Sequence, residues 1–236
     1  MTVQAKEPTS AHLKPKVIFF DVNETLLDLE AMKTSVSQAL GGRDDLLPLW
    51  FSTMLHHSLV ESATQNHHTF GEVGVAALMM VAEINKIELS QDEATKAIIP
   101  PLRSLPPHPD VIAGLKTLKD KGYTLVSLTN SSLKGVQTQF KNAKLTPYFD
   151  KSLSVDDVKL YKPHTKTYEW AAKQMGIEVD EGLLVAAHGW DIAGAKAAGM
   201  HAVFIARPGK VLYPLAKKPD AVITNLNELP DLLEKP

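Results

Sequence analysis

The chain has 236 residues, no cysteine, a hydrophobic content of 44% and a formal charge of -2 at neutral pH. The lack of cysteine excludes disulfides and thiolate metal sites, and the small net charge gives no reason to expect nucleic acid or an anionic membrane as a partner. No apolar stretch approaches the roughly 20 residues that cross a bilayer.

Residues 1–15 form a polar N-terminal segment without the apolar centre of a signal peptide. We therefore expect a disordered leader at these positions and a cytoplasmic protein. The first regular element is expected directly after the leader.

Five short apolar runs predict strands that are covered on both faces. They are residues 17–20, 124–129, 183–187, 202–206 and 221–224. Helical stretches lie between these runs, for instance residues 110–122, where Asp110 is expected to cap the helix and Gly122 to end it. Strands that alternate with helices predict an α/β fold with a Rossmann-like, doubly wound parallel sheet.

Residues 31–104 differ from the rest because they show helical periodicity and no clear strand. The segment begins soon after the first strand and ends at the Pro-rich residues 105–109. We expect an inserted all-helical cap domain over the active edge of the sheet. The α/β core then consists of residues 16–30 and 105–236.

Polar residues follow the predicted strands at the edge where an open parallel sheet binds its ligands. Asp21 follows the first strand, Thr129 and Asn130 follow the second, Lys162 lies in the next loop, and Asp191 comes shortly after the third apolar run. Taken alone, the first of these is also explained as a turn or helix cap, and the lysine as a solvated surface residue. Their gathering at one edge favours an active site.

Four segments, FFDVNETLLD, LTNSS, YKP and HGWDIAGAKAAG, resemble in this order the motifs of the haloacid dehalogenase (HAD) superfamily. The resemblance is strongest to its L-2-haloacid dehalogenase branch, type II, and covers about residues 16–232. It implies a hydrolase that attacks C2 of a small 2-haloalkanoate, with inversion, to give an ester and then a 2-hydroxy acid. It further implies that no metal or other cofactor is needed, and that the protein is a homodimer, for which the sequence gives no independent sign.

The resemblance also implies catalytic roles for four residues. Asp21 is the nucleophile that forms the ester, and Thr25 orients its carboxylate. Lys162 keeps that carboxylate ionised and, with Asp191, polarises the water that cleaves the ester.

Other positions are expected to bind the substrate. Thr129 and Asn130 would present donors to substrate oxygens or to the leaving halide, and Trp190 would form part of the halide pocket. Tyr168 would donate to the lysine network, although packing beside Trp170 explains it equally well.

Two positions depart from the pattern of HAD phosphatases. Asn23, a further residue expected to face the substrate, stands where those enzymes carry a general acid, and Ala186 stands where the first of two acids is found. An amide cannot donate the proton, and a methyl group offers no oxygen to Mg²⁺. A dehalogenase is therefore favoured, and a Mg²⁺-dependent phosphatase acting on a small phosphomonoester is the alternative.

Two further positions depart from the dehalogenase pattern itself. Phe51 stands where the branch carries an arginine that binds the leaving halide, and the stretch Ala186–His188 replaces a Ser-x-Asn motif. These changes leave open a weakly active or non-catalytic HAD-fold binding protein. Phe51 and His188 are counted among the substrate-binding candidates, with His188 either activating the hydrolytic water or serving as a hydrogen-bonded structural residue.

Overall fold

The structure is a computed structural model that describes residues 13–234. In these residues, six parallel strands form one sheet with the order β3-β2-β1-β4-β5-β6. The strands are β1 (Val17–Phe20), β2 (Thr124–Thr129), β3 (Lys151–Ser154), β4 (Gly182–Ala186), β5 (His201–Ile205) and β6 (Ala221–Ile223).

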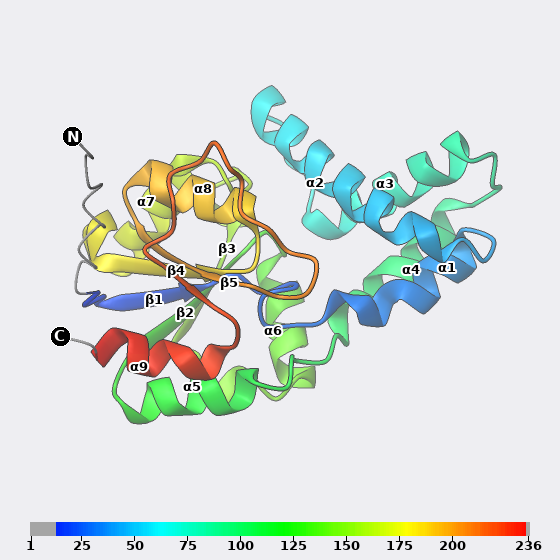
Figure 1. Ribbon diagram of the computed structural model, residues 1–236. Helices are drawn as coiled ribbons and strands as arrows, with labels where there is room; N and C mark the ends of the chain where they lie inside the picture. Colours follow the sequence, from blue (N-terminus) through cyan, green and yellow to red (C-terminus); the bar gives the residue numbers. More distant parts are fainter. Residues whose placement is uncertain (1–12, 235–236) are drawn as a thin grey trace, which may run out of the picture.

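Helices cover both faces of the sheet (Figure 1). One face carries α5 (Val111–Asp120), α6 (Leu133–Asn142) and α9 (Leu229–Glu234), and the other carries α7 (Thr165–Gln174) and α8 (Gly189–Ala198). The central strand explains this arrangement, because successive side chains point to opposite faces. Ile18 and Phe20 belong to the apolar cluster of the first face, and Val17 and Phe19 belong to that of the second. The doubly wound parallel sheet is confirmed.

A helical domain lies beside the core (Figure 1) and follows a short 3-10 helix at Leu29–Met32. Its helices are α1 (Lys33–Ala39), α2 (Leu47–Thr64), α3 (Phe70–Ile84) and α4 (Gln91–Arg103). The chain enters and leaves this domain side by side, since the Asp28 amide donates to the Pro106 carbonyl at 2.8 Å. The inserted cap is therefore tied to the core by two adjacent connections.

The five predicted strands are found within one residue of their expected bounds. Strand β3 was not predicted, because its sequence, KSLS, is polar and lies at the sheet edge, where it pairs only with β2. The prediction that the Asp110 side chain caps a helix is wrong. Asp110 does precede α5, but its carboxylate makes no cap and instead accepts from Arg207 at 2.8 Å and from the Leu226 amide at 2.6 Å.

The predicted leader, residues 1–15, lies largely outside the described residues. Its described part includes Leu13, which is buried against the core. Over residues 13–234, no helix is both long enough and apolar enough to span a membrane.

Candidate active site

Charged side chains of alternating sign form a continuous row beyond the carboxyl ends of the central strands. We call these six residues the charge row. In order, they are Asp191, Lys162, Asp21, His188, Glu24 and Lys210. Three of them are carboxylates, and each carboxylate lies within hydrogen-bond distance of at least one cationic side chain.

Asp21 lies at the centre of the charge row because β1 ends directly before it. Its Oδ2 accepts a hydrogen bond from Thr25 Oγ1 at 2.6 Å, and its Oδ1 accepts from Lys162 Nζ at 2.9 Å. Burial alone would raise the pKa of Asp21, but Lys162, His188 and Thr25 together hold that pKa well below its usual range. The Asp21 carboxylate is therefore ionised.

Thr25 is held in place from two further sides. Its Oγ1 accepts from the Ala187 amide at 2.9 Å, which ties the turn after β1 to the end of β4. The Arg207 guanidinium donates to the Thr25 carbonyl at 3.0 and 3.1 Å. This rigid turn fixes the hydroxyl that orients the Asp21 carboxylate.

Lys162 is fully buried between two carboxylates. Its Nζ donates to Asp191 Oδ2 at 2.6 Å as well as to Asp21. Burial lowers the pKa of Lys162, but the charges of Asp191 and Asp21 outweigh that effect and raise it. Lys162 is thus a buried cation and not a surface lysine.

Asn130 holds the backbone of Lys162. Its Oδ1 accepts from the Lys162 amide at 3.0 Å, and its Nδ2 lies 3.5 Å from the Lys162 carbonyl. Asn130 thus positions the lysine, and its contact with the substrate stays a prediction.

Asp191 has no exposed surface, and both of its oxygens are engaged. Tyr168, also fully buried, donates its hydroxyl to Asp191 Oδ1, so the tyrosine belongs to the lysine network as well as to the core. Burial raises the pKa of Asp191, Lys162 lowers it and Asp21 raises it, with a net increase. Asp191 therefore orients Lys162 and is shielded from water, in contrast to its predicted role beside the hydrolytic water.

Asn23 and Thr129 are turned toward the protein. Asn23 Oδ1 accepts from Gln139 at 2.9 Å, and Asn23 Nδ2 donates to Ser131 Oγ at 3.2 Å. Thr129 Oγ1 accepts from the Ser131 amide at 3.1 Å. Both side chains are thus part of the packing between the turn after β1, the end of β2 and α6, and their contacts with substrate stay predictions.

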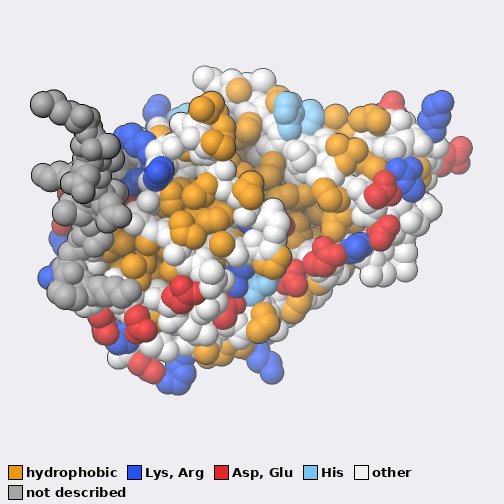
Figure 2. All heavy atoms as spheres, viewed as in Figure 1, with side chains coloured by type: hydrophobic (Ala, Val, Ile, Leu, Met, Phe, Trp, Pro, Cys, Tyr) orange, Lys and Arg blue, Asp and Glu red, His pale blue; other side chains and the backbone are white. Residues whose placement is uncertain are grey.

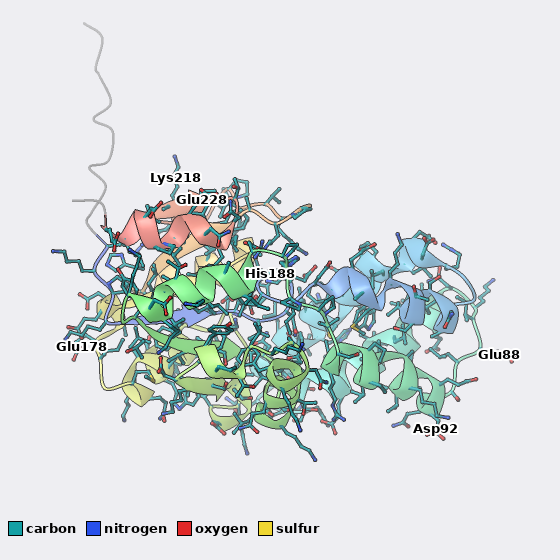
Figure 3. The ribbon with its side chains drawn as sticks, turned by 90° about the horizontal axis from the view of Figure 1, so that it is seen from below. Glu88, Asp92, Glu178, His188, Lys218 and Glu228 are labelled. Carbon is teal, nitrogen blue, oxygen red and sulfur yellow. The ribbon has the colours of Figure 1, made fainter. Side chains whose placement is uncertain are left out.

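His188 lies where the core meets the helical domain (Figure 3). Its Nδ1 is 3.2 Å from Asp21 Oδ2, and its Nε2 is 2.8 Å from Glu24 Oε2. Phe51 stacks on the imidazole at a centroid distance of 6.0 Å, and Trp190 stacks at 4.9 Å. Phe51 thus occupies the cap position expected from the sequence and meets a ring of the core.

A cleft of about 560 Å³ opens between the helical domain and the core, and Figure 2 shows hydrophobic side chains gathered in this hollow. Phe51 and Leu55 line it from α2, while His188, Trp190 and Lys210 line it from the core. The cleft therefore leads along an apolar wall to the charge row, which it meets at Glu24, His188 and Lys210.

The structure brings together every predicted site residue except Asn23 and Thr129, whose side-chain hydrogen bonds lie toward α6 and the end of β2. It adds Glu24 and Lys210, which the sequence reasoning did not select. Glu24 lies in the first of the four motifs, whereas Lys210 lies in the loop after β5, where no motif marks it. Glu24 adopts a left-handed backbone conformation (φ 63°), rare for a residue other than glycine.

Among residues 13–234, no group of three or more His, Asp or Glu side chains is arranged to hold a metal ion. The donor chemistry agrees with this, because Lys162 Nζ already bridges Asp21 and Asp191. In addition, Asn23 stands where a second acid would follow β1, and its amide oxygen accepts a hydrogen bond from Gln139.

Comparisons with known proteins give a consistent result. A family model described as haloacid dehalogenase-like hydrolase matches residues 15–199. The chain is 29% identical to an (S)-2-haloacid dehalogenase of Pseudomonas sp. (strain YL), over 93% of this chain and 94% of the relative. It is 27% identical to haloacetate dehalogenase H-2 of Moraxella sp. (strain B), over 93% and 98%.

A solved structure similar to this one is the L-2-haloacid dehalogenase of Xanthobacter autotrophicus with chloropropionic acid covalently bound. The TM-score is 0.87 at 24% identity, and the match covers 93% of this chain and 98% of that chain. This likeness establishes a common fold.

Proposed function

The chain belongs to the haloacid dehalogenase-like hydrolase family, and from this premise we propose that it hydrolyses a 2-haloalkanoate with Asp21 as the nucleophile. The observation that carries the proposal is the ionised Asp21 carboxylate, fixed by Thr25 and Lys162, with the amide of Asn23 in place of a second carboxylic acid. Displacement of a halide needs such a carboxylate and no general acid.

The reaction proceeds in two steps that balance. The Asp21 carboxylate attacks C2 of the substrate, the carbon–halogen bond breaks, and halide leaves with the bonding electrons and inversion at C2. Water then attacks the aspartyl carbonyl and releases the 2-hydroxy acid, an ionised Asp21 and one proton. Oδ1 is suited to the attack, because it accepts one hydrogen bond whereas Oδ2 is bound by both Thr25 and His188.

Trp190 offers a binding contact for an anion. Its Nε1–H is buried and finds no acceptor within the described part of the chain. A buried donor without an acceptor is unfavourable by about 1–3 kcal/mol, so an incoming acceptor is stabilised there. The substrate carboxylate and the departing halide are both acceptors, and Lys162 Nζ lies 5.9 Å from the centroid of the Trp190 ring.

The phosphatase alternative has less support from these residues. Transfer of a phosphoryl group to Asp21 requires protonation of an alkoxide, yet Asn23 carries an amide whose oxygen is occupied by Gln139. Asp191 is buried with both oxygens engaged. The cytoplasmic location and homodimeric assembly expected from the sequence stay predictions.

The first prediction concerns halide release. With racemic 2-chloropropionate in the presence of EDTA, we expect chloride and lactate in equal amounts, detected by ion chromatography and NMR. Asp21→Asn should lower the rate by at least 1,000-fold, since the nucleophile is lost; this is about 4 kcal/mol or more in activation free energy. In a single turnover in H₂¹⁸O, the new hydroxyl should carry unlabelled oxygen from Asp21.

Asp120→Asn is the matched control, because Asp120 is an exposed carboxylate at the end of α5. It should keep the wild-type rate. Release of phosphate from phosphomonoesters on addition of Mg²⁺, together with no halide release, would instead establish the phosphatase. An unchanged rate in Asp21→Asn would contradict the nucleophile assignment.

A further inference from the structure

His188 is placed between two carboxylates. Nδ1 faces Asp21 Oδ2 at 3.2 Å, and Nε2 faces Glu24 Oε2 at 2.8 Å. A neutral imidazole has one donor and one acceptor, whereas an imidazolium has two donors. Since ionised carboxylates only accept, both contacts are satisfied together only when the ring is a cation.

The flat faces of the same ring are covered by aromatic side chains from both domains. Phe51 of the cap lies at 6.0 Å with an interplanar angle of 25°, and Trp190 of α8 lies at 4.9 Å with an angle of 24°. Aromatic faces attract cations, and only 6% of the His188 surface is exposed. The ring is therefore fixed in orientation as well as in charge.

We propose that His188 is a positioning residue whose imidazolium ring fixes the carboxylate of Asp21 for attack and that Phe51 of the cap holds this ring in place. The proposal rests on the function proposed above. Thr25 and His188 both donate to Oδ2, so the plane of the carboxylate is set and Oδ1 is left as the oxygen with a single contact, to Lys162.

The surroundings of His188 favour the cation. Burial lowers the pKa of His188, but hydrogen bonds to Asp21 and Glu24 and their charges raise it to about 9. The other charged groups near it are Lys162, over the Trp190 ring, and Lys210, which is ion-paired to Glu24 and lies 5.7 Å from the centroid of Phe51. Lys162 has Asp191 as a further carboxylate partner, whereas Lys210 shares Glu24 with His188.

This arrangement differs from a general base. A base must present a free nitrogen lone pair to water, but both ring nitrogens of His188 face carboxylates. The sequence left open a role in activating water, and the geometry favours an indirect role through Asp21.

The test is the conservative variant His188→Gln, which keeps one donor and loses the charge. We expect kcat for 2-chloropropionate to fall 10- to 100-fold while KM changes less than threefold. The decline of the wild-type rate as the pH rises through about 9 should be absent from the variant. His201→Gln is the matched control, because His201 is also paired with a carboxylate, Asp220, but lies at the amino end of β5, away from the carboxyl ends of the strands. This variant should keep the pH–rate profile of the wild type.

A second measurement does not depend on turnover. In ¹⁵N NMR spectra at pH 7, the ring of His188, assigned by its loss in His188→Gln, should show two protonated nitrogens, and it should titrate at about pH 9. In Asp21→Asn, its pKa should fall, because a negative charge has been removed. Titration near 6.5 in the wild type would overturn the proposal, as would an unchanged kcat or a persisting alkaline decline in a folded His188→Gln.

The two failures are distinguishable. If wild-type protein releases no halide, the proposed function fails, and the NMR titration alone decides whether His188 is the cation that contacts Asp21. If halide is released and the titration is normal, the function stands and the positioning role is wrong.

Discussion

Lys162 has no exposed surface and is the shared partner of two carboxylates. Desolvating an ammonium group is unfavourable by several kcal/mol unless close countercharges offset it. Here Asp21 and Asp191 do so at 2.9 and 2.6 Å. The lysine therefore neutralises a nucleophile that would otherwise lie beside a second buried negative charge.

Replacing this lysine should be severe. We expect Lys162→Met to remove activity and to lower the free energy of unfolding by about 3–5 kcal/mol at pH 7, because two buried carboxylates lose their counterion. At lower pH, the difference in the free energy of unfolding between wild type and Lys162→Met should be smaller, because protonation of Asp191 removes one of the two buried negative charges. Urea unfolding at pH 5 and pH 7 measures both effects.

Lys116→Met is the control for that experiment. Lys116 forms an exposed pair with Asp120 on α5, and water screens such pairs. Its urea midpoint should match that of the wild type. An equal loss of stability in both variants would show that burial of Lys162 is not the cause.

Stability should also depend on His188 at alkaline pH. Its pKa is raised from 6.5 to about 9 on folding, so the stabilising contribution is complete below pH 6.5 and is lost as the pH rises through about 9. The part of the stability difference between wild type and His188→Gln that varies with pH is on the order of 3 kcal/mol. Urea unfolding of both proteins at pH 6 and pH 10 checks this; a constant difference would contradict it.

The residues of the site were only partly predictable. Asp21, Lys162 and Asp191 could be selected from polar positions after apolar runs, because a parallel sheet places such positions at one edge. Asn23 and Asn130 follow the same rule, yet their side chains bind Gln139 and the Lys162 backbone. Sequence position fixes the edge on which a side chain lies, whereas rotamers and local packing decide what it contacts.

At the scale of elements, α8 packs very closely against the loop that carries Lys162 and Pro163. A methyl group at Gly194 would lie 2.6 Å from Pro163 Cβ and from the Tyr168 hydroxyl. The absence of a side chain at this position therefore allows α8 to bring Asp191 into contact with Lys162.

Gly194→Ala should accordingly displace α8. We expect a loss of about 1–3 kcal/mol from overpacking and at least a tenfold lower kcat, measured by thermal unfolding and halide release. Gly71→Ala is the control, because its new methyl group would meet only the flexible end of Ile99. Equal losses in the two variants would argue against a special role for the close approach.

The elements themselves show where sequence patterns work and where they fail. Strand β1 is apolar throughout and β2 carries the apolar residues Leu125, Val126 and Leu128, and both were located correctly. Strand β3 has only two buried residues and a polar sequence, so no apolar run identifies it. Helix α4 continues through Pro100 and Pro101 to Arg103, because packing of Ile98 and Leu102 in the apolar core outweighs the preference of proline for helix ends.

At the scale of the whole molecule, the cap contacts the core at a second point besides its two connections. Tyr161 donates its hydroxyl to the His68 carbonyl, and its amide donates to Ser62 Oγ at 2.9 Å. His67 adds a contact to Asp156 at 2.9 Å and stacks on the Tyr161 ring. We call these contacts between α2, the α2–α3 loop and the core the latch.

The cap and its position over the edge of the sheet were expected from the sequence, but the individual contacts between the cap and the core were not. Phe51 and His188 are far apart in the sequence and stack because the latch and the two connections fix the cap over the sheet edge. Neither residue carries a pattern that announces this contact. Long-range packing of this kind depends on the shapes of both domains, which a local pattern does not encode.

Tyr161 of the latch is the immediate neighbour of Lys162. One peptide bond thus joins Tyr161, which holds the cap, to Lys162, the cation beside Asp21. A substitution at Ser62 or in the α2–α3 loop should therefore change the turnover rate even though it leaves the residues that line the cleft unchanged. For protein engineering, the α2–α3 loop should therefore be left unchanged when the side chains that line the cleft are redesigned.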